Sequence, residues 1–290
     1  MYLKSLISQG TQTISRLYSE SEAREMVLAY LCDTLGIRRH THILEPSYEV
    51  TPEESAAAVM AFERMASGEP LQYVTGKAPF YGRTFHVTPS TLIPRPETEL
   101  LCRMAVEAVS QKSPRILDLC TGSGCIAWTL ALELPESEVV AVDLSEGALE
   151  VASSQDFSDE ISCTGASVPK FFKADVLAAP EDSLLSPSFD LILSNPPYVM
   201  DKEKSQMRPN VLDHEPHMAL FVPDHDPLIF YRAVAAWSVA FLSDNGCGIV
   251  EINESLGGQT ADVFRNAGFG TVQVLKDLND KDRFVRFSWK

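Results

Sequence analysis

Two kinds of hydrophobic pattern divide this chain. Up to about residue 75, apolar residues recur at the spacing of α-helices. The segment 21–35 carries such a stripe and stops before Gly36. A second helix begins at Thr51, which can cap it; Pro52 suits the first helical position, and Glu54 completes a capping box. The pattern therefore predicts a small helical bundle over residues 1–75.

A short segment of different character follows the bundle. Between residues 73 and 93, strand-forming residues such as Tyr73, Val74 and Phe85 are punctuated by glycine and proline. This composition predicts a β-hairpin, and we expect residues 76–93 to link the bundle to a larger domain over residues 94–290.

The larger domain alternates strand and helix patterns along the sequence. Strands are predicted at 115–119, 138–143, 169–174, 189–194, 247–252, 271–276 and 283–289, and helices near 97–110, 124–134, 146–155, 226–243 and 256–267. This order predicts an α/β fold, a doubly wound and mostly parallel sheet of seven strands with helices on both faces. Ligands of such sheets bind at the carboxyl ends of the strands.

Composition narrows the possible partners. The net charge of −16, from 24 basic and 40 acidic residues, disfavours an extended nucleic-acid surface. The six cysteines include no C-x-x-C pair, which predicts reduced thiols in the cytoplasm and no metal site. No apolar run is long enough to cross a bilayer. We expect a cytoplasmic monomer that binds neither membrane nor nucleic acid directly.

A glycine turn follows the first predicted strand of the large domain. Residues 115–127 read as an apolar strand, a turn of small residues and the start of a helix, with Gly122 and Gly124 allowing a ligand close to the backbone. Ala127 stands where a dinucleotide fingerprint needs its third glycine. This favours a ligand with a carboxylate over a pyrophosphate.

Two acids end the next two strands. Asp143 is placed to accept hydrogen bonds from ribose hydroxyls, and Asp175 to hold an adenine amino group with Val176 against the ring. Either acid alone is as easily a solvated turn residue. Together with the glycine turn, they resemble the S-adenosylmethionine pocket of class I methyltransferases.

The fourth strand runs into Asn195, Pro196, Pro197 and Tyr198. Asn-Pro and Pro-Pro are also ordinary turn signals, but here two prolines fix the backbone at the predicted ligand edge. The Asn195 side-chain oxygen and the Pro196 carbonyl can each accept one N–H of a substrate NH₂ group, and Tyr198 can pack on a flat substrate. The motif fits methyl transfer to an amide or an aromatic amine and does not choose between them.

Several segments together resemble the release factor glutamine N5-methyltransferase family, a class I S-adenosylmethionine-dependent group. The resemblance is carried by residues 69–76, 92–99, 118–124, 195–198, 214–216 and 277–283. It implies a Rossmann-like methyltransferase fold, an N-terminal bundle that recognises the release factor, and methylation of the glutamine in its Gly-Gly-Gln loop.

The resemblance also assigns residues. The cofactor positions implied by family and pattern are Cys120, Thr121, Gly122, Ser123, Gly124, Asp143, Asp175, Val176 and Asn195. The substrate positions are Asn195, Pro196, Pro197 and Tyr198, with Asn195, Pro196 and Tyr198 as the catalytic group. The chain departs from the family at Cys120, where glycine is usual, and at Val176, where an aromatic is common. Residues 199–225 are expected to form a loop over the substrate.

Other readings stay open. A related family methylates a glutamine of a large-subunit ribosomal protein, and the segment 94–97 favours the release factor type over it. A nucleic-acid amino-methyltransferase would need a basic face, and a non-catalytic interaction module would not need an intact motif at 195–198. Glu215 is either a substrate-loop residue or a salt-bridged acid, Arg95 is expected to be structural, and Glu251 and Asn253 are expected to support the pocket floor.

Overall fold

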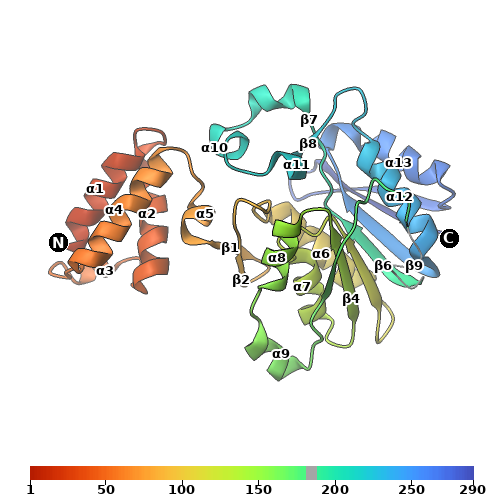
Figure 1. The fold of residues 1–290 in the computed structure, drawn as a ribbon, viewed down its shortest axis with the longest axis horizontal. Coiled ribbons are helices and arrows are strands. Elements are labelled where there is room, and N and C mark those ends of the chain that lie inside the picture. The colour runs from red at the N-terminus through yellow and green to blue at the C-terminus, as the bar shows by residue number, and fades with distance from the viewer. Residues whose placement is uncertain (181–187) are drawn as a thin grey trace. The chain divides into compact units, whose positions relative to one another are not determined.

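The computed structural model describes residues 1–180 and 188–290. The chain folds into two compact units (Figure 1). The smaller comprises residues 1–77 and 207–214, and the larger comprises residues 78–206 and 215–290.

The smaller unit is a bundle of helices. Its elements are α1 (Leu3–Ile14), α2 (Glu20–Leu35), α3 (Thr41–Leu44), α4 (Pro52–Ala66), α5 (Leu71–Thr75) and, from the later segment, α10 (Pro209–Leu212). The predicted capping box is present at Thr51, and Gly36 ends α2 in the left-handed conformation. A Cβ on Gly10 would lie 2.6 Å from the Phe62 ring, so glycine is what lets α1 approach α4 this closely.

The later segment joins this unit although its sequence neighbours belong to the larger one. Arg208 forms an ion pair with Glu22 at 3.2 Å, and the His214 ring lies 3.4 Å from the position of a Cβ on Gly68. Residues 199–225 were expected to be a loop, and the structure instead shows a series of short elements. These are β7 (Val199–Met200), η1 (Asp201–Gln206), α10, α11 (His217–Leu220) and β8 (Phe221–Val222).

The predicted hairpin is real but begins later than its strand-forming residues suggested. It consists of β1 (Lys77–Phe80) and β2 (Arg83–His86). The interpretation of Tyr73 and Val74 as strand residues was wrong, because both lie in α5. Gly76 ends that helix in the left-handed conformation, and burial of Tyr73 in the helical setting outweighs its intrinsic strand preference.

The larger unit confirms the predicted α/β class. Its sheet has seven strands in the order β10-β11-β9-β6-β3-β4-β5, in which β11 runs antiparallel to β9 and β10 and the other pairs are parallel. The strands are β3 (Arg115–Leu119), β4 (Glu138–Asp143), β5 (Lys170–Lys173), β6 (Phe189–Ser194), β9 (Leu242–Glu251), β10 (Thr271–Lys276) and β11 (Asp282–Ser288). The strand order reverses at β3, which is where ligands of doubly wound sheets bind.

Helices cover both faces of this sheet (Figure 1). They are α6 (Pro96–Ala108), α7 (Cys125–Glu133), α8 (Glu146–Ser153), α9 (Ser158–Thr164), α12 (Ile229–Phe241), the short η2 (Glu254–Leu256) and α13 (Gly257–Asn266). Successive residues of β3 face opposite layers, so Ile116 packs with α6 and α7, whereas Leu117 and Leu119 pack with α12 and α13.

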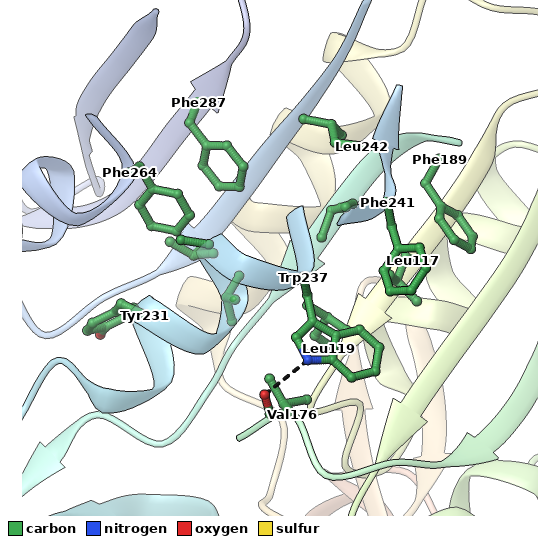
Figure 2. Close-up of a cluster of buried hydrophobic side chains, with 14 of the residues drawn as sticks. Leu117, Leu119, Val176, Phe189, Tyr231, Trp237, Phe241, Leu242, Phe264 and Phe287 are labelled. Carbon is green, nitrogen blue, oxygen red and sulfur yellow. Dashed lines mark hydrogen bonds between the residues drawn. The ribbon is translucent and has the colours of Figure 1, made fainter. Parts of the chain in front are cut away.

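A tryptophan of α12 holds Val176, a residue predicted to bind the cofactor, in place. Figure 2 shows the Trp237 ring of α12 among buried aromatic and aliphatic side chains, with its indole N–H directed at Val176. That N–H donates to the Val176 carbonyl at 3.0 Å. Trp237 is therefore a core residue that also holds the backbone beyond β5 in place.

Candidate functional site

A pocket with a cavity volume of about 160 Å³ lies at the carboxyl ends of β3, β4 and β6. The pocket brings together residues from the glycine turn, both strand-end acids and the segment after β6. Of the predicted site residues it is lined by Cys120, Thr121, Gly122, Ser123, Asp143, Asp175, Val176, Asn195 and Pro197, while Gly124, Pro196 and Tyr198 are not in its wall.

The glycine turn has a left-handed backbone at three positions. The φ angles are 62° at Cys120, 56° at Gly122 and 78° at Gly124. A Cβ on Gly122 would meet nothing within 4 Å, so the turn leaves open space there for a ligand. Gly124 has another reason to be glycine, since a Cβ would lie 3.0 Å from Ala152 and 3.1 Å from Trp128. Cys120 is the one member of the three that carries a side chain in this strained region.

Asp143 ties the turn to the end of β4. Its Oδ2 accepts a hydrogen bond from the Gly122 N–H at 2.8 Å, and its Oδ1 accepts one from the Ser145 N–H at 2.9 Å. Burial raises the pKa of Asp143, and these backbone hydrogen bonds oppose the rise. Asp175 is by contrast exposed, and its Oδ1 accepts from the Leu177 N–H at 2.9 Å.

A buried carboxyl lies beneath the turn, and sequence reasoning did not single it out as a site residue. Asp118 is fully buried, and its Oδ2 accepts from the Thr121 hydroxyl at 2.6 Å. Within the described ranges its Oδ1 has no hydrogen-bond partner. Burial raises the pKa of Asp118 to about 7. The available signal was a charged residue inside an otherwise apolar strand, since such residues are rarely buried without a reason.

The segment after β6 turns its residues in different directions. Asn195 lines the pocket and donates from Nδ2 to the Thr98 hydroxyl at 3.0 Å. Tyr198 points away from the wall, and its hydroxyl donates to Glu251 Oε1 at 3.0 Å. Burial and the nearby Glu251 carboxylate raise the pKa of Tyr198 well above its ordinary value. Pro197 contributes to the wall between them.

Residues after β9 support this segment, as the sequence predicted. Asn253 donates from Nδ2 to the Tyr198 carbonyl at 3.2 Å and to Glu203 at 3.0 Å. Its own N–H donates to the Tyr231 hydroxyl at 3.1 Å. The backbone of the 195–198 segment is therefore held by a buried amide as well as by its prolines.

A second buried acid stabilises the opposite wall. Glu215 accepts from the Ile93 N–H at 3.2 Å and from Arg95 at 2.5 Å. The Glu215 side chain is 1% exposed and that of Arg95 32%. Arg95, Met218 and Ala219 line the pocket, so this ion pair joins the segment before α6 to the segment that carries α11. Of the two predictions for Glu215, the structure agrees with a salt-bridged acid, and it agrees with the structural role expected for Arg95.

Among the residues that the structure describes, no three His, Cys, Asp or Glu side chains are grouped so that they could hold a metal ion. In the same part of the chain, none of the helices is long and apolar enough to cross a bilayer.

Comparison with known proteins decides the family. Residues 5–76 match the family model of the PrmC N-terminal domain, and residues 97–214 match that of the methyltransferase small domain. The release factor glutamine methyltransferase of Flavobacterium psychrophilum is 34% identical to this chain over 100% of both. The Bacteroides thetaiotaomicron protein of the same name is 36% identical over 94% of this chain and 95% of its own. The chain belongs to the release factor glutamine methyltransferase family.

A solved structure supports the fold. The hMettl16 catalytic domain, determined in complex with a MAT2A 3′UTR hairpin, has a TM-score of 0.50 and 13% identity, and the match covers 83% of each chain. At this identity the likeness concerns the fold alone. The family and the Rossmann-like fold together make the chain a methyltransferase whose cofactor is S-adenosylmethionine.

The residues of the pocket fit that cofactor. Gly122 leaves room for close approach of a ligand to the backbone. S-adenosylmethionine is a cation that also carries ribose hydroxyls, and the Asp143 carboxylate at the pocket wall suits both properties. When bound, the cofactor supplies an electrophilic methyl group on a sulfonium.

Proposed function

We propose that the chain methylates the side-chain amide nitrogen, N5, of the glutamine in the Gly-Gly-Gln motif of peptide chain release factors. The observation that carries the proposal is Asn195, whose side chain lines the pocket and is held by a hydrogen bond to Thr98. The full-length relatives named for this activity supply the substrate class.

The chemistry asks the protein to position an amide. An amide nitrogen is a weak nucleophile, because its lone pair is delocalised into the carbonyl. Asn195 Oδ1 accepts one N–H of the substrate amide, which fixes the nitrogen and favours its pyramidal form. Acceptance of the second N–H by the Pro196 carbonyl oxygen stays a prediction, because Pro196 is not in the pocket wall. Tyr198 is held by Glu251 and supports the segment from behind. Alignment of the two reactants is itself a large rate effect.

The bond changes balance without a general base from the protein. With the cofactor bound, the substrate nitrogen would gain a bond to the methyl carbon while the bond between that carbon and sulfur would break, which would leave the sulfur as a neutral thioether. The methylated nitrogen then loses one proton to water. The positive charge of the sulfonium thus ends on the released proton, and no side chain has to change protonation state.

The domain assignment follows from the same proposal. Residues 1–75 would recognise the release factor, residues 76–93 would link, and residues 94–290 would carry the transfer. The match of residues 5–76 to the PrmC N-terminal domain supports the first assignment. We further propose that the enzyme acts as a monomer in the cytoplasm, where release factors work, without direct contact with nucleic acid or membrane. The net charge of −16 supports the absence of a nucleic-acid surface.

Intact-protein mass spectrometry tests the substrate. A purified peptide release factor is incubated with this protein and S-adenosylmethionine, and parallel reactions hold a large-subunit ribosomal protein or a release factor with alanine in place of the Gly-Gly-Gln glutamine. We expect the release factor alone to gain the mass of one methyl group. A gain on the ribosomal protein but not on the release factor would favour the related family instead.

A further inference from the structure

Four side chains that are far apart in the sequence form a continuous chain of hydrogen bonds that begins at the pocket wall, where Asn195 and Thr98 both lie. Asn195 Nδ2 donates to Thr98 Oγ1 at 3.0 Å, and Thr98 Oγ1 donates to Glu251 Oε2 at 2.7 Å. Tyr198 donates to the other oxygen of the same carboxyl at 3.0 Å. Thr98 and Glu251 are 2% and 1% exposed, so water does not compete for these groups.

The chemistry of each group fixes the direction of this chain. A carboxylate only accepts hydrogen bonds, so both hydroxyls that reach Glu251 must donate to it. Thr98 has a single hydroxyl hydrogen and donates it to Glu251, so its oxygen can only accept a hydrogen bond from Asn195. Because Thr98 Oγ1 can only accept a hydrogen bond from Asn195, the Asn195 amide must direct its NH₂ group toward it. The amide must then turn its oxygen away from Thr98.

That orientation matters for the reaction proposed above. An amide side chain can present either an oxygen or an NH₂ group in almost the same volume, and only the oxygen accepts from a substrate N–H. If the Asn195 amide were rotated by 180°, its NH₂ group would face the N–H of the substrate, and two donors would meet. A buried polar group with the wrong partner is as costly as one with none.

We propose that Thr98 and Glu251 are positioning residues that set the orientation of the Asn195 amide, so that its oxygen is the group offered to the substrate nitrogen. This inference rests on the proposed function. It gives the segment 93–98 a second role beside the Arg95 and Glu215 ion pair, because the start of α6 is what places Thr98 against Asn195.

Kinetics of matched variants test the inference. Thr98→Val keeps the shape and removes the hydroxyl, Thr98→Ser keeps the hydroxyl, and Thr129→Val is the control. Thr129 is also a fully buried threonine of the same unit, but its hydroxyl has no partner among the described residues and is not part of the pocket wall.

Turnover should fall about 10- to 100-fold in Thr98→Val, the factor expected for a lost buried hydrogen bond. Thr98→Ser and Thr129→Val should stay within about threefold of the wild type, the scatter of neutral substitutions on this scale. The dissociation constant for S-adenosylmethionine, measured by calorimetry, should not move in any of them. Equal turnover in Thr98→Val and wild type, or equal loss in Thr98→Ser, would overturn the inference.

Two further measurements separate positioning from general damage. In an Asn195→Ala background, Thr98→Val should cause no additional loss in single-turnover rate, because Thr98 acts only through Asn195. A full additional loss there would show that it acts by another route.

The second measurement does not depend on the substrate. In wild-type protein without release factor, the side-chain NH₂ of Asn195 should give a distinct pair of ¹⁵N–¹H resonances that shifts in Thr98→Val and is retained in Thr98→Ser. Unchanged resonances in Thr98→Val would contradict the inference. If the wild type itself methylated no release factor, the proposed function would fail while this spectrum still decided the role of Thr98.

Discussion

The two halves of the pocket are built in different ways. The cofactor half comes from one continuous strand, turn and helix over residues 115–127, closed by the acid at the end of the neighbouring strand β4. The substrate half is assembled from distant segments, since Asn195 and Thr98 are 97 residues apart and Thr98 and Glu251 are 153 apart. The first half is readable from local sequence, and the second exists only once the sheet and α6 have packed.

This difference predicts that damage to the two halves will be seen in different measurements. Changes in the substrate half should lower turnover at constant cofactor affinity. Changes in the cofactor half should weaken cofactor binding and leave turnover at saturating cofactor nearly intact.

The largest effect is expected for Asn195→Ala. The variant loses the oxygen that orients the substrate amide, and turnover should fall by at least about 100-fold, the range found when a group that orients or stabilises the reacting atoms is removed. Cofactor affinity from calorimetry should change much less. Turnover close to that of the wild type would end the proposed role of Asn195, and a parallel collapse of cofactor binding would erase the distinction between the two halves.

Asp143→Ala should show the opposite behaviour. The variant loses the acceptor for the Gly122 and Ser145 N–H groups, and we expect cofactor affinity to fall about 10- to 100-fold. Turnover at saturating cofactor should be largely retained. Asp175→Ala serves as the comparison, because Asp175 is exposed and accepts only one backbone N–H, so its loss should be smaller. A larger loss in Asp175→Ala would reverse the importance assigned to the two acids.

The Asp118 carboxyl makes the stability of the cofactor half depend on pH. Its pKa of about 7 in the folded protein lies above its value in the unfolded chain, about 3.9. Between those values the folded state binds one more proton than the unfolded state, so the free energy of unfolding falls as pH rises. The expected slope is about 1.4 kcal/mol per pH unit from pH 5 to 6, and it levels off above pH 7.

Urea unfolding at several pH values checks this slope. The comparison is between the wild type and Asp118→Asn, which keeps an acceptor for Thr121 but does not titrate. The stability of the wild type relative to the variant should decrease from pH 5 to 7. A constant difference over that interval would mean that Asp118 is already ionised when the protein is folded at pH 5.

The smallest effect is expected at Cys120. Its φ of 62° is unfavourable for any residue with a Cβ, so Cys120→Gly should stabilise the fold by up to about 1 kcal/mol. Cys120→Ala is the matched control, because it removes the sulfur and keeps the Cβ. Denaturant unfolding should rank glycine above alanine. The reverse order would show that the turn tolerates a side chain at no cost in backbone strain.

The features of the fold and the cofactor half that arise from local sequence patterns could be predicted from the sequence. The seven strands, the five predicted helices, the glycine turn and the acids at the ends of β4 and β5 are set by local patterns, and the structure places them as predicted. The short helix α9 was not predicted. Tyr73 and Val74 were assigned to a strand on their intrinsic preference for β-structure alone. Tertiary packing instead places both in helix α5.

The remaining site residues carry no local signal of their role. Thr98 is one polar residue in the first turn of a helix, and nothing nearby marks it as a partner of Asn195. Tyr198 was expected to face the substrate, and the structure directs its hydroxyl to Glu251. That remains compatible with a supporting role, and the direct role of its ring stays a prediction. The position of such residues depends on which strands become neighbours, and the strand order is a property of the whole sheet.

The most direct test of the account locates the transferred methyl group on an atom. A release factor treated with this protein and S-adenosylmethionine is digested, its Gly-Gly-Gln peptide is fragmented in the mass spectrometer, and the same peptide is hydrolysed in acid. We expect one methyl group on the glutamine and release of methylamine, as for methylation of the amide nitrogen, with far less of both products from Asn195→Ala in the same time. A methyl group on another residue, or methanol from the hydrolysis, would contradict the orientation of a glutamine amide as the function of this pocket.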